Sequence, residues 1–187
     1  MLIVGLGNPG EQYTKTRHNA GFLFIDELVA SSNASLSYAS KFKADVARFK
    51  LNGVDVHVIK PQTFMNNSGS SVGAYAKYFN IPVENILVAH DELDLSSGEV
   101  RLKKSGGHGG HNGLRDIISH LASKDFYRVR LGIGHPGDKT QVSNYVLSRP
   151  GRQEEKNLLE AVSKSLLVMG DVVKGEYQPA MQALHAP

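Results

Sequence analysis

Residues 1–10 read Met-Leu-Ile-Val-Gly-Leu-Gly-Asn-Pro-Gly, and this stretch decides how the fold is interpreted. The apolar run at 2–6 has no polar residue, which is typical of a strand buried on both faces of a sheet. The Gly-Asn-Pro-Gly turn then ends it. A second short apolar run, Ile86 to Ala89, has the same character. These runs predict interior strands of a sheet that helices cover on both sides.

A hairpin and two further strands extend this sheet. Residues 47–51 and 54–58 alternate between apolar and polar side chains on either side of Asn52-Gly53, which is a strong hairpin signal. Residues 99–103 and 127–133 also alternate. Their polar positions predict cationic outer faces made of Arg101, Lys103, Arg128 and Arg130.

Helical spacing of apolar residues separates these strands. It occurs at 22–29, 72–79 and 114–121, and a longer stripe from Leu158 to Val173 ends at Gly175. Strands interleaved with helices predict a three-layer α/β fold with a mixed, twisted sheet flanked by helices. We expect one domain over residues 1–187, with residues 106–113 forming a glycine-rich mobile loop near the site.

Composition narrows the chemistry. The chain has no cysteine, which excludes thiol nucleophiles, thiolate metal sites and disulfides. The first residues contain no basic leader and no long apolar segment, so we expect a cytoplasmic protein without a membrane span. The net charge is +3 and the basic residues are grouped, but composition alone favours a solvated face over a nucleic-acid footprint.

Two motifs imitate known sites. Gly5 to Gly10 satisfies G-x-G-x-x-G after a strand, but Pro9 lies in the turn and the helical pattern begins only near Asn19, so dinucleotide binding is disfavoured. Residues 69–73 match G-x-S-x-G, which raises a serine esterase using Ser71. Ten residues separate Ser71 from the preceding strand, and Ser68 or Ser70 is better explained as a helix N-cap.

Histidines in the glycine-rich segment raise a third alternative, a metal site. His108 and His111 could join the sequence His90-Asp91-Glu92 around a metal ion. Zinc requires ligands held rigidly, whereas the surrounding glycines supply mobility. A loop that closes over a substrate explains the composition better, and we expect no metal and no organic cofactor.

Polar side chains just beyond predicted strands or at helix starts form the remaining constellation. Open α/β sheets bind ligands at that edge. Each residue alone has an ordinary explanation as a turn, cap or surface residue, but their convergence on one edge weakens it. The set comprises Asn8, His18, Asn66, Asp91 and Asn112.

These residue types suit ester hydrolysis by activated water. A histidine titrates near neutral pH and can accept a proton from water, while a carboxylate on the other ring nitrogen holds the required tautomer. His18 is the candidate base and Asp91 the candidate carboxylate. Amides such as Asn66 and Asn112 can donate to an oxyanion or to ribose hydroxyls.

Longer segments carry a specific resemblance. They resemble the bacterial-type peptidyl-tRNA hydrolases, in the same order along nearly the whole chain. His135 departs from the pattern, because many members carry arginine there. The matching segments are residues 4–10, 13–22, 60–69, 90–95, 109–114, 128–134 and 145–147.

The resemblance implies hydrolysis of the ester in peptidyl-tRNA, with a role for each matched residue. His18 corresponds to the catalytic base, Asp91 to the residue that holds its basic form, and Asn8 to the position that distinguishes blocked from free aminoacyl-tRNA. Lys103 and Arg130 correspond to a basic pair on the 5′ phosphate, which revises the interpretation of the basic face. Positions that contact the tRNA acceptor end are Tyr13, Phe64, Asn66 and Asn112.

Peptidyl-tRNA is therefore the expected partner, with no obligate protein partner and a monomeric state. Two other functions remain open at this point. The chain could be a non-catalytic RNA-binding relative of the same fold, since fold does not determine function. It could also be the serine esterase based on Ser71.

Overall fold

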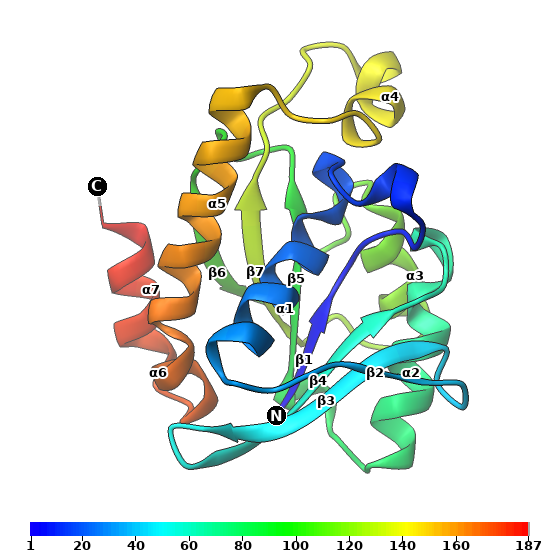
Figure 1. Cartoon of the computed structure of the whole chain (residues 1–187), viewed down its shortest axis with the longest axis vertical. Helices are drawn as coiled ribbons and strands as arrows, with labels where there is room; N and C mark the ends of the chain where they lie inside the picture. Colours follow the sequence, from blue (N-terminus) through cyan, green and yellow to red (C-terminus); the bar gives the residue numbers. More distant parts are fainter. Residues whose placement is uncertain (187) are drawn as a thin grey trace.

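The computed structural model describes residues 1–186, and its centre is a seven-stranded mixed sheet with helices on both faces (Figure 1). The strand order is β2-β3-β4-β1-β5-β7-β6. Strands β4, β1, β5 and β7 run parallel, whereas β2, β3 and β6 pair antiparallel with their neighbours. The strands are β1 (Leu2–Gly5), β2 (Ser37–Ala39), β3 (Ala44–Leu51), β4 (Val54–Pro61), β5 (Ile86–Glu92), β6 (Val100–Lys104) and β7 (Tyr127–Gly132).

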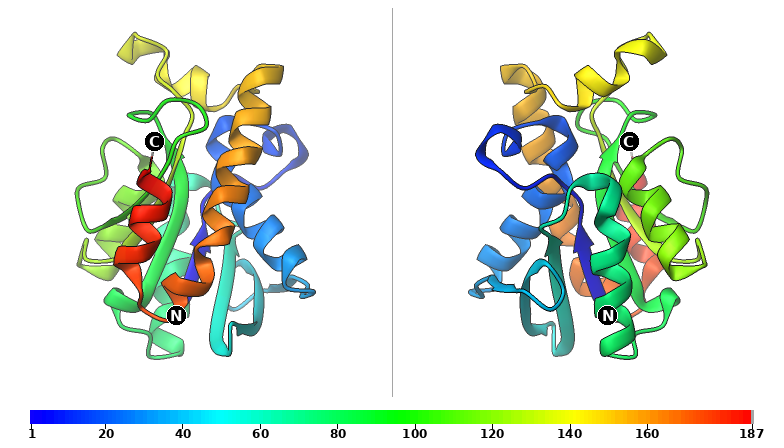
Figure 2. Two further views of the ribbon diagram at one scale, coloured as in Figure 1. Left: turned by 90° about the vertical axis from the view of Figure 1, so that its left-hand side faces the viewer. Right: turned by 90° about the vertical axis from the view of Figure 1, so that its right-hand side faces the viewer.

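Two helical layers cover the sheet. Helices α2 and α3 pack on one face, and α1 and α5 to α7 on the other, so the three layers are visible edge-on (Figure 2). The predicted three-layer α/β fold is confirmed. The helices are α1 (Ala20–Ser31), α2 (Ser68–Tyr78), α3 (Asn112–Leu121), α4 (Val142–Val146), α5 (Arg152–Leu167), α6 (Met169–Val173) and α7 (Tyr177–His185).

The interior strands and the hairpin form as predicted. All four residues of β1 are buried, and the register places β1 between β4 and β5. The hairpin turn has positive φ angles at Asn52 (46°) and Gly53 (81°), as a two-residue turn of this hand requires. The strand was predicted from an uninterrupted apolar run, which is typical of a sheet interior. The hairpin was predicted from alternating side chains on either side of Asn52-Gly53, which is typical of a tight turn.

The single long C-terminal helix was a wrong prediction. The chain instead forms α5, breaks at Val168, forms α6, and adds α7 after Gly175. Gly170 lies against the hairpin turn. A β-carbon on Gly170 would lie 2.1 Å from Nδ2 of the Asn52 side chain. The break at Val168 lies two residues before this tertiary contact, which no local pattern announces. The stripe is also interrupted, because Leu159 is exposed.

The N-cap predicted at Ser68 or Ser70 is wrong as well. Helix α2 begins at Ser68 with Asn67 as its N-cap, because the chain enters through a 3₁₀ turn at Met65–Asn67. The two serine hydroxyls donate to carbonyls three residues earlier, those of Met65 and Asn67. Among residues 1–186, no helix is long and apolar enough to cross a membrane.

Candidate active site

A close approach of α1 to β1 places the start of α1 at the carboxyl edge of the sheet. A β-carbon on Gly21 would lie 2.3 Å from the Ala89 carbonyl oxygen and 2.4 Å from the Leu6 nitrogen. A β-carbon on Gly5 would lie 2.2 Å from the Gly21 carbonyl oxygen. Glycine at both positions therefore lets the backbones touch. The residues just before α1 are thereby held beside the end of β5.

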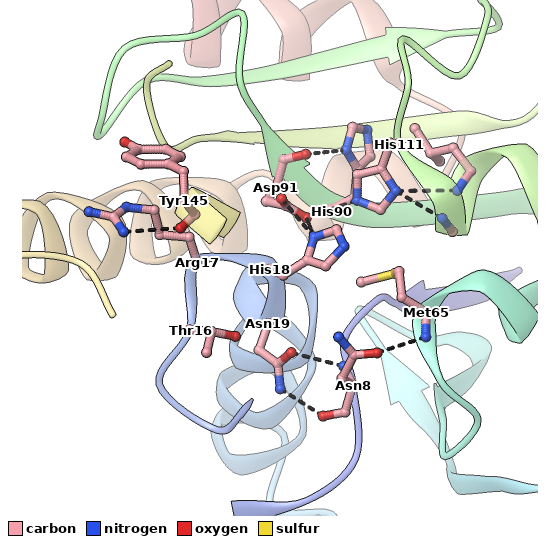
Figure 3. A network of polar contacts seen from close by, with 12 residues as sticks. Asn8, Thr16, Arg17, His18, Asn19, Met65, His90, Asp91, His111 and Tyr145 are labelled. Atoms are coloured by element: carbon pink, nitrogen blue, oxygen red, sulfur yellow. Dashed lines mark hydrogen bonds and ion pairs between the residues drawn. The ribbon is translucent and has the colours of Figure 1, made fainter. Parts of the chain in front are cut away.

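His18 and Asp91, predicted to pair, meet at this edge (Figure 3). His18 lies in the 3₁₀ turn Arg17–Asn19 that leads into α1, and Asp91 lies near the end of β5. The Nδ1 atom of His18 is 3.0 Å from Oδ1 and 2.9 Å from Oδ2 of Asp91, and both residues are buried. Because Nδ1–H donates to the carboxylate, Nε2 is the ring nitrogen that can accept a proton.

His111 completes this cluster, although the sequence placed it only in the mobile loop or, as a disfavoured alternative, in a metal site. Its Nε2 lies 2.8 Å from Oδ1 of Asp91. Its Nδ1 accepts the backbone N–H groups of Gly113 and Leu114, so His111 is the N-cap of α3. Accepting at Nδ1 requires the proton on Nε2, which then donates to Asp91. A histidine immediately before a helix start was the available signal.

Charge and burial set the protonation states of the pair. Burial disfavours the imidazolium of His18, but the charge and hydrogen bond of Asp91 outweigh it and raise the pKa of His18. Burial opposes ionisation of Asp91 too, yet the two histidines beside it lower its pKa well below the usual range. Asp91 is thus a carboxylate at neutral pH. It stabilises positive charge on His18 at the moment a proton arrives.

His90, next to Asp91 on β5, has the opposite character. It is almost fully buried, and its Nδ1–H donates to the Asp91 carbonyl oxygen over 2.7 Å. Burial, followed by the neighbouring His111, lowers the pKa of His90 to about 3. His90 is therefore neutral over the physiological range and cannot be the base that titrates near neutral pH.

The amide of Asn8 is oriented by backbone groups. Its Oδ1 accepts the Met65 N–H over 2.8 Å. Asn19 fixes the Asn8 backbone, because its Oδ1 accepts the Asn8 N–H over 2.8 Å and its Nδ2 donates to the Asn8 carbonyl over 3.0 Å (Figure 3). With Oδ1 committed, the Asn8 side chain offers its two Nδ2 hydrogens as donors. The sequence interpretation did not include Asn19 as a support for Asn8.

A cleft of about 710 Å³ opens over these residues. Its lining includes the predicted residues Asn8, His18, Phe64, Asn66, Asp91 and Asn112. The Phe64 ring is exposed at the rim, where it meets the Tyr13 ring edge-on at a centroid distance of 6.5 Å. The opposite wall comes from α4, with Val142, Val146 and Leu147, and was not predicted. His135 also lines the cleft.

The basic pair Lys103 and Arg130 lies outside the cleft, on β6 and β7. The register pairs Lys103 with Arg128 and Arg101 with Arg130, so all four point to one face of the sheet. Arg130 contacts Glu92 at 3.0 Å. The expectation of a fully exposed cationic face is wrong at Arg128, which is buried because the glycine-rich segment covers it.

The structure bears on two alternatives raised by the sequence, a serine esterase that uses Ser71 and a metal site. Ser71 lies inside α2 with its side chain buried, not on a strand-to-helix turn, so the geometry of a nucleophile elbow is absent from residues 69–73. The nitrogens of His18 and His111 and the Asp91 carboxylate lie within 4.8 Å of one another and are the best candidate metal ligands in the described chain. The N-cap role of His111 leaves a proton on its Nε2, which favours hydrogen bonding over metal binding there.

Comparison with known proteins decides the family. The family model described as peptidyl-tRNA hydrolase matches residues 2–187. The chain belongs to the peptidyl-tRNA hydrolase family. It is 53% identical over 185 residues to a peptidyl-tRNA hydrolase of Halorhodospira halophila, covering 99% of this chain and 95% of that protein. It is also 53% identical to a Pseudomonas entomophila peptidyl-tRNA hydrolase, covering 98% and 95% of the two chains.

Solved structures agree with this assignment. The crystal structure of peptidyl-tRNA hydrolase from Acinetobacter baumannii superposes with a TM-score of 0.97 at 45% identity. The match covers 99% of this chain and 94% of that one. Both the predicted fold class and the predicted membership of the peptidyl-tRNA hydrolase family are therefore confirmed.

Proposed function

We propose that the chain hydrolyses the ester between a peptide and the terminal ribose of tRNA, with His18 as general base. The contact between His18 Nδ1 and Asp91 carries the proposal, because it leaves Nε2 as the proton acceptor in a buried ion-pair geometry. General-base catalysis of this kind contributes about 10²- to 10⁴-fold to a rate. Membership of the peptidyl-tRNA hydrolase family supports the same substrate.

The reaction needs one water molecule. His18 Nε2 takes a proton as the water oxygen attacks the ester carbonyl, and Asp91 stabilises the imidazolium. Asn66 and Asn112 line the cleft, and their amides donate hydrogen bonds to the negative oxygen that forms. The intermediate then collapses, and the imidazolium returns its proton to the ribose oxygen that leaves. The products are free tRNA and a peptide with a carboxyl terminus.

Asn8 accounts for selection of blocked substrates. Its Oδ1 is bound to the Met65 N–H, so its Nδ2 hydrogens face potential acceptors. The carbonyl of a peptide bond on the esterified amino acid can accept such a hydrogen bond. The α-ammonium of a free aminoacyl-tRNA is itself a hydrogen-bond donor and cannot accept from Nδ2. It would face the Asn8 donors without forming a hydrogen bond.

The tRNA itself is held by contacts that do not read base sequence. Phe64 and Tyr13 offer aromatic surface to the acceptor end, and stacking of one base contributes about 1–3 kcal/mol. Lys103 and Arg130 offer cations to the 5′ phosphate. We propose that the enzyme works as a cytoplasmic monomer with no obligate protein partner, and with neither metal nor organic cofactor.

One assay tests the proposal. His18→Gln, which keeps a polar side chain of similar reach, should lower release of N-acetyl-aminoacyl groups from tRNA by at least about 100-fold. Filter binding of the intact tRNA should remain within a few-fold of the parent chain. Unaltered turnover would exclude His18 as the base. A parent chain that binds tRNA but releases nothing would instead identify a non-catalytic RNA-binding relative, and loss of activity with a chelator would indicate a metal.

A further inference from the structure

The segment Ser105–His111 joins the cationic strand β6 to the catalytic cluster. It leaves β6 just after Lys103 and Lys104 and ends at His111, which donates to Asp91. Its downstream part is a compact turn, in which the His111 N–H donates to the His108 carbonyl over 2.9 Å. Residues 108–112 line the catalytic cleft. The position of this segment therefore affects both the phosphate-facing strand and the site of hydrolysis.

A single buried guanidinium holds the upstream half of this segment. Arg128 on β7 donates through Nη1 to the Gly107 carbonyl over 2.6 Å and through Nη2 to the Gly106 carbonyl. At Gly107, Gly109 and Gly110, within the described residues 1–186, a β-carbon would have no atom within 4 Å apart from those of the glycine and its two chain neighbours. The glycines thus contribute no side-chain packing of their own. Ser105 at the start of the segment donates to the Asp125 carboxylate over 2.9 Å, and beyond it Arg128 and Asp91 are the side chains that hold Gly106–Gly107 and His111.

The charge of Arg128 is unusual for a buried residue. Arg101 and Arg130, on the same face, each contact a glutamate, at 3.2 and 3.0 Å. Within residues 1–186, Arg128 has no carboxylate within ion-pair distance and is bound by carbonyl oxygens instead. Burial, followed by the nearby Arg130, lowers the pKa of Arg128. The charge of Glu92 opposes this lowering only in part. A buried cation without an ion-paired carboxylate is costly, so we expect the paired N–H donors of Arg128 to have a specific use.

We infer that Arg128 is a positioning residue that fixes the glycine-rich segment, so that His111 and Asn112 stay in place over the ester while tRNA is gripped at Lys103. This inference rests on the proposed function, because it concerns the same site. Arg128 does not itself contact the phosphate. Two of its five N–H donors bind the Gly106 and Gly107 carbonyls and its side chain is buried beneath the segment, whereas Lys103, its direct partner in the strand register, is exposed and extends towards Gly106.

Arg128→Met tests the inference, since it keeps the apolar stem and removes the donors. Released from Arg128, the segment should lose the contact between His111 and Asp91. The negative charge of Asp91 would then be shared with no second histidine and would stabilise the imidazolium of His18 more strongly. Water entering the site would also solvate that imidazolium. Both effects raise the pKa of His18. We expect kcat/KM for N-acetyl-aminoacyl-tRNA to fall about 10- to 100-fold, with the acid limb of its pH profile moved to higher pH.

Salt dependence separates positioning from direct phosphate binding. In Lys103→Ala, the slope of log kcat/KM against log salt should become shallower by about one. In Arg128→Met the slope should match the parent chain. Arg128→Lys, which retains charge but not the paired donors, should behave like Arg128→Met. A shallower slope with an unshifted pH profile would show that Arg128 binds phosphate, and would overturn the inference.

Two glycine substitutions provide a matched pair that leaves Arg128 intact. Gly106 has a φ of 115°, a conformation that alanine rarely adopts, so Gly106→Ala should displace the segment and shift the pH profile in the same direction. Gly107→Ala places its methyl group in open space and should be close to the parent chain. Equal effects of Gly106→Ala and Gly107→Ala would overturn the inference. So would a loss of activity in Arg128→Met that changes neither the pH profile nor the salt dependence. If the parent chain itself fails to release peptides, the proposed function fails instead.

Discussion

His18 and Asp91, 73 residues apart in the chain, form a two-oxygen contact in which one ring nitrogen lies 3.0 and 2.9 Å from the two carboxylate oxygens. One of these oxygens also accepts from His111 over 2.8 Å. The carboxylate is therefore held from two sides before any substrate binds. Its charge, and not only its position, determines how readily His18 accepts a proton.

Asp91→Asn should separate charge from shape. The amide keeps the size of the carboxylate but removes the interaction that raises the pKa of His18, so that pKa should fall. We expect kcat to drop by about 10²- to 10⁴-fold, because the imidazolium formed during attack is no longer stabilised. Steady-state release of N-acetyl-aminoacyl groups and an NMR titration of His18 measure the two effects. An unchanged His18 titration would contradict the assignment.

The pH profile of the parent chain should have an acid limb set by His18. Only the neutral imidazole can accept a proton, so kcat/KM should decline as pH falls through the pKa of His18. Since that pKa is raised, the decline should begin at higher pH than for an ordinary histidine. Rate measurements between pH 5 and 9 with a single tRNA check this. A flat profile across that range would remove histidine from the mechanism.

His90 should make the fold sensitive to acid. Its pKa is about 3 in the folded chain, below that of an unfolded histidine, so between about pH 6.5 and pH 3 the unfolded chain binds the additional proton. Stability from this group is present above that window and lost as pH falls through it. His90→Asn can keep the donor to the Asp91 carbonyl without a titrating group.

Urea unfolding of both chains at several pH values isolates the contribution of His90. The free energy of unfolding of His90→Asn should fall less steeply between pH 6.5 and 4 than that of the parent chain. His18, whose folded pKa is raised, contributes in the opposite direction: its stabilisation is full at low pH and lost as pH rises through the folded pKa. Because His18 is present in both chains, its contribution cancels in the comparison. Parallel curves would contradict the prediction.

Asn8→Asp should invert the selectivity. The carboxylate can still accept the Met65 N–H but replaces the two Nδ2 donors by an acceptor. Hydrolysis of N-acetyl-aminoacyl-tRNA should fall, and free aminoacyl-tRNA, with its α-ammonium, should become the relatively better substrate. The ratio of kcat/KM for the same tRNA with and without the acetyl group reports the change. A ratio equal to that of the parent chain would rule out selection by Asn8.

Gly21→Ala should be severely destabilising, whereas Gly73→Ala should be tolerated. The added methyl at position 21 would lie 2.3 Å from a backbone oxygen, so α1 would have to leave the sheet. At position 73, also within a helix, the nearest atom would be 3.4 Å away, and alanine is favoured over glycine by about 0.5–1 kcal/mol. Urea unfolding of the two variants measures the contrast. Similar stabilities would show that the contact between α1 and β1 is loose.

The sequence was most informative where local pattern and tertiary structure have the same cause. The buried strands β1 and β5 and the Asn52-Gly53 hairpin could be predicted because sheet burial and turn conformation restrict residue type directly. The break between α5 and α6 could not be predicted, because it lies beside Gly170, whose neighbour is a turn more than a hundred residues away in the chain.

The site shows the same division. His18, Asp91 and the asparagines could be selected because they lie at strand ends and helix starts, and family resemblance supplied their individual roles. His111 could not be separated from its flexible-looking neighbours, since its cap on α3 depends on the three-dimensional path of the segment. Arg128 alternates with apolar residues like a surface cation, yet the glycine-rich segment buries it.

The orientation of Asn8 depends on main-chain atoms. The Oδ1 atom of Asn8 accepts the backbone N–H of residue 65. The side chain of Asn19 binds the backbone N–H and carbonyl of Asn8. The contact from position 65 uses only the backbone N–H, which every residue except proline supplies. An inhibitor that accepts hydrogen bonds from Nδ2 of Asn8 would thus engage a donor whose orienting contact at position 65 survives every substitution there except proline, whereas substitution of Asn19 would release the Asn8 backbone.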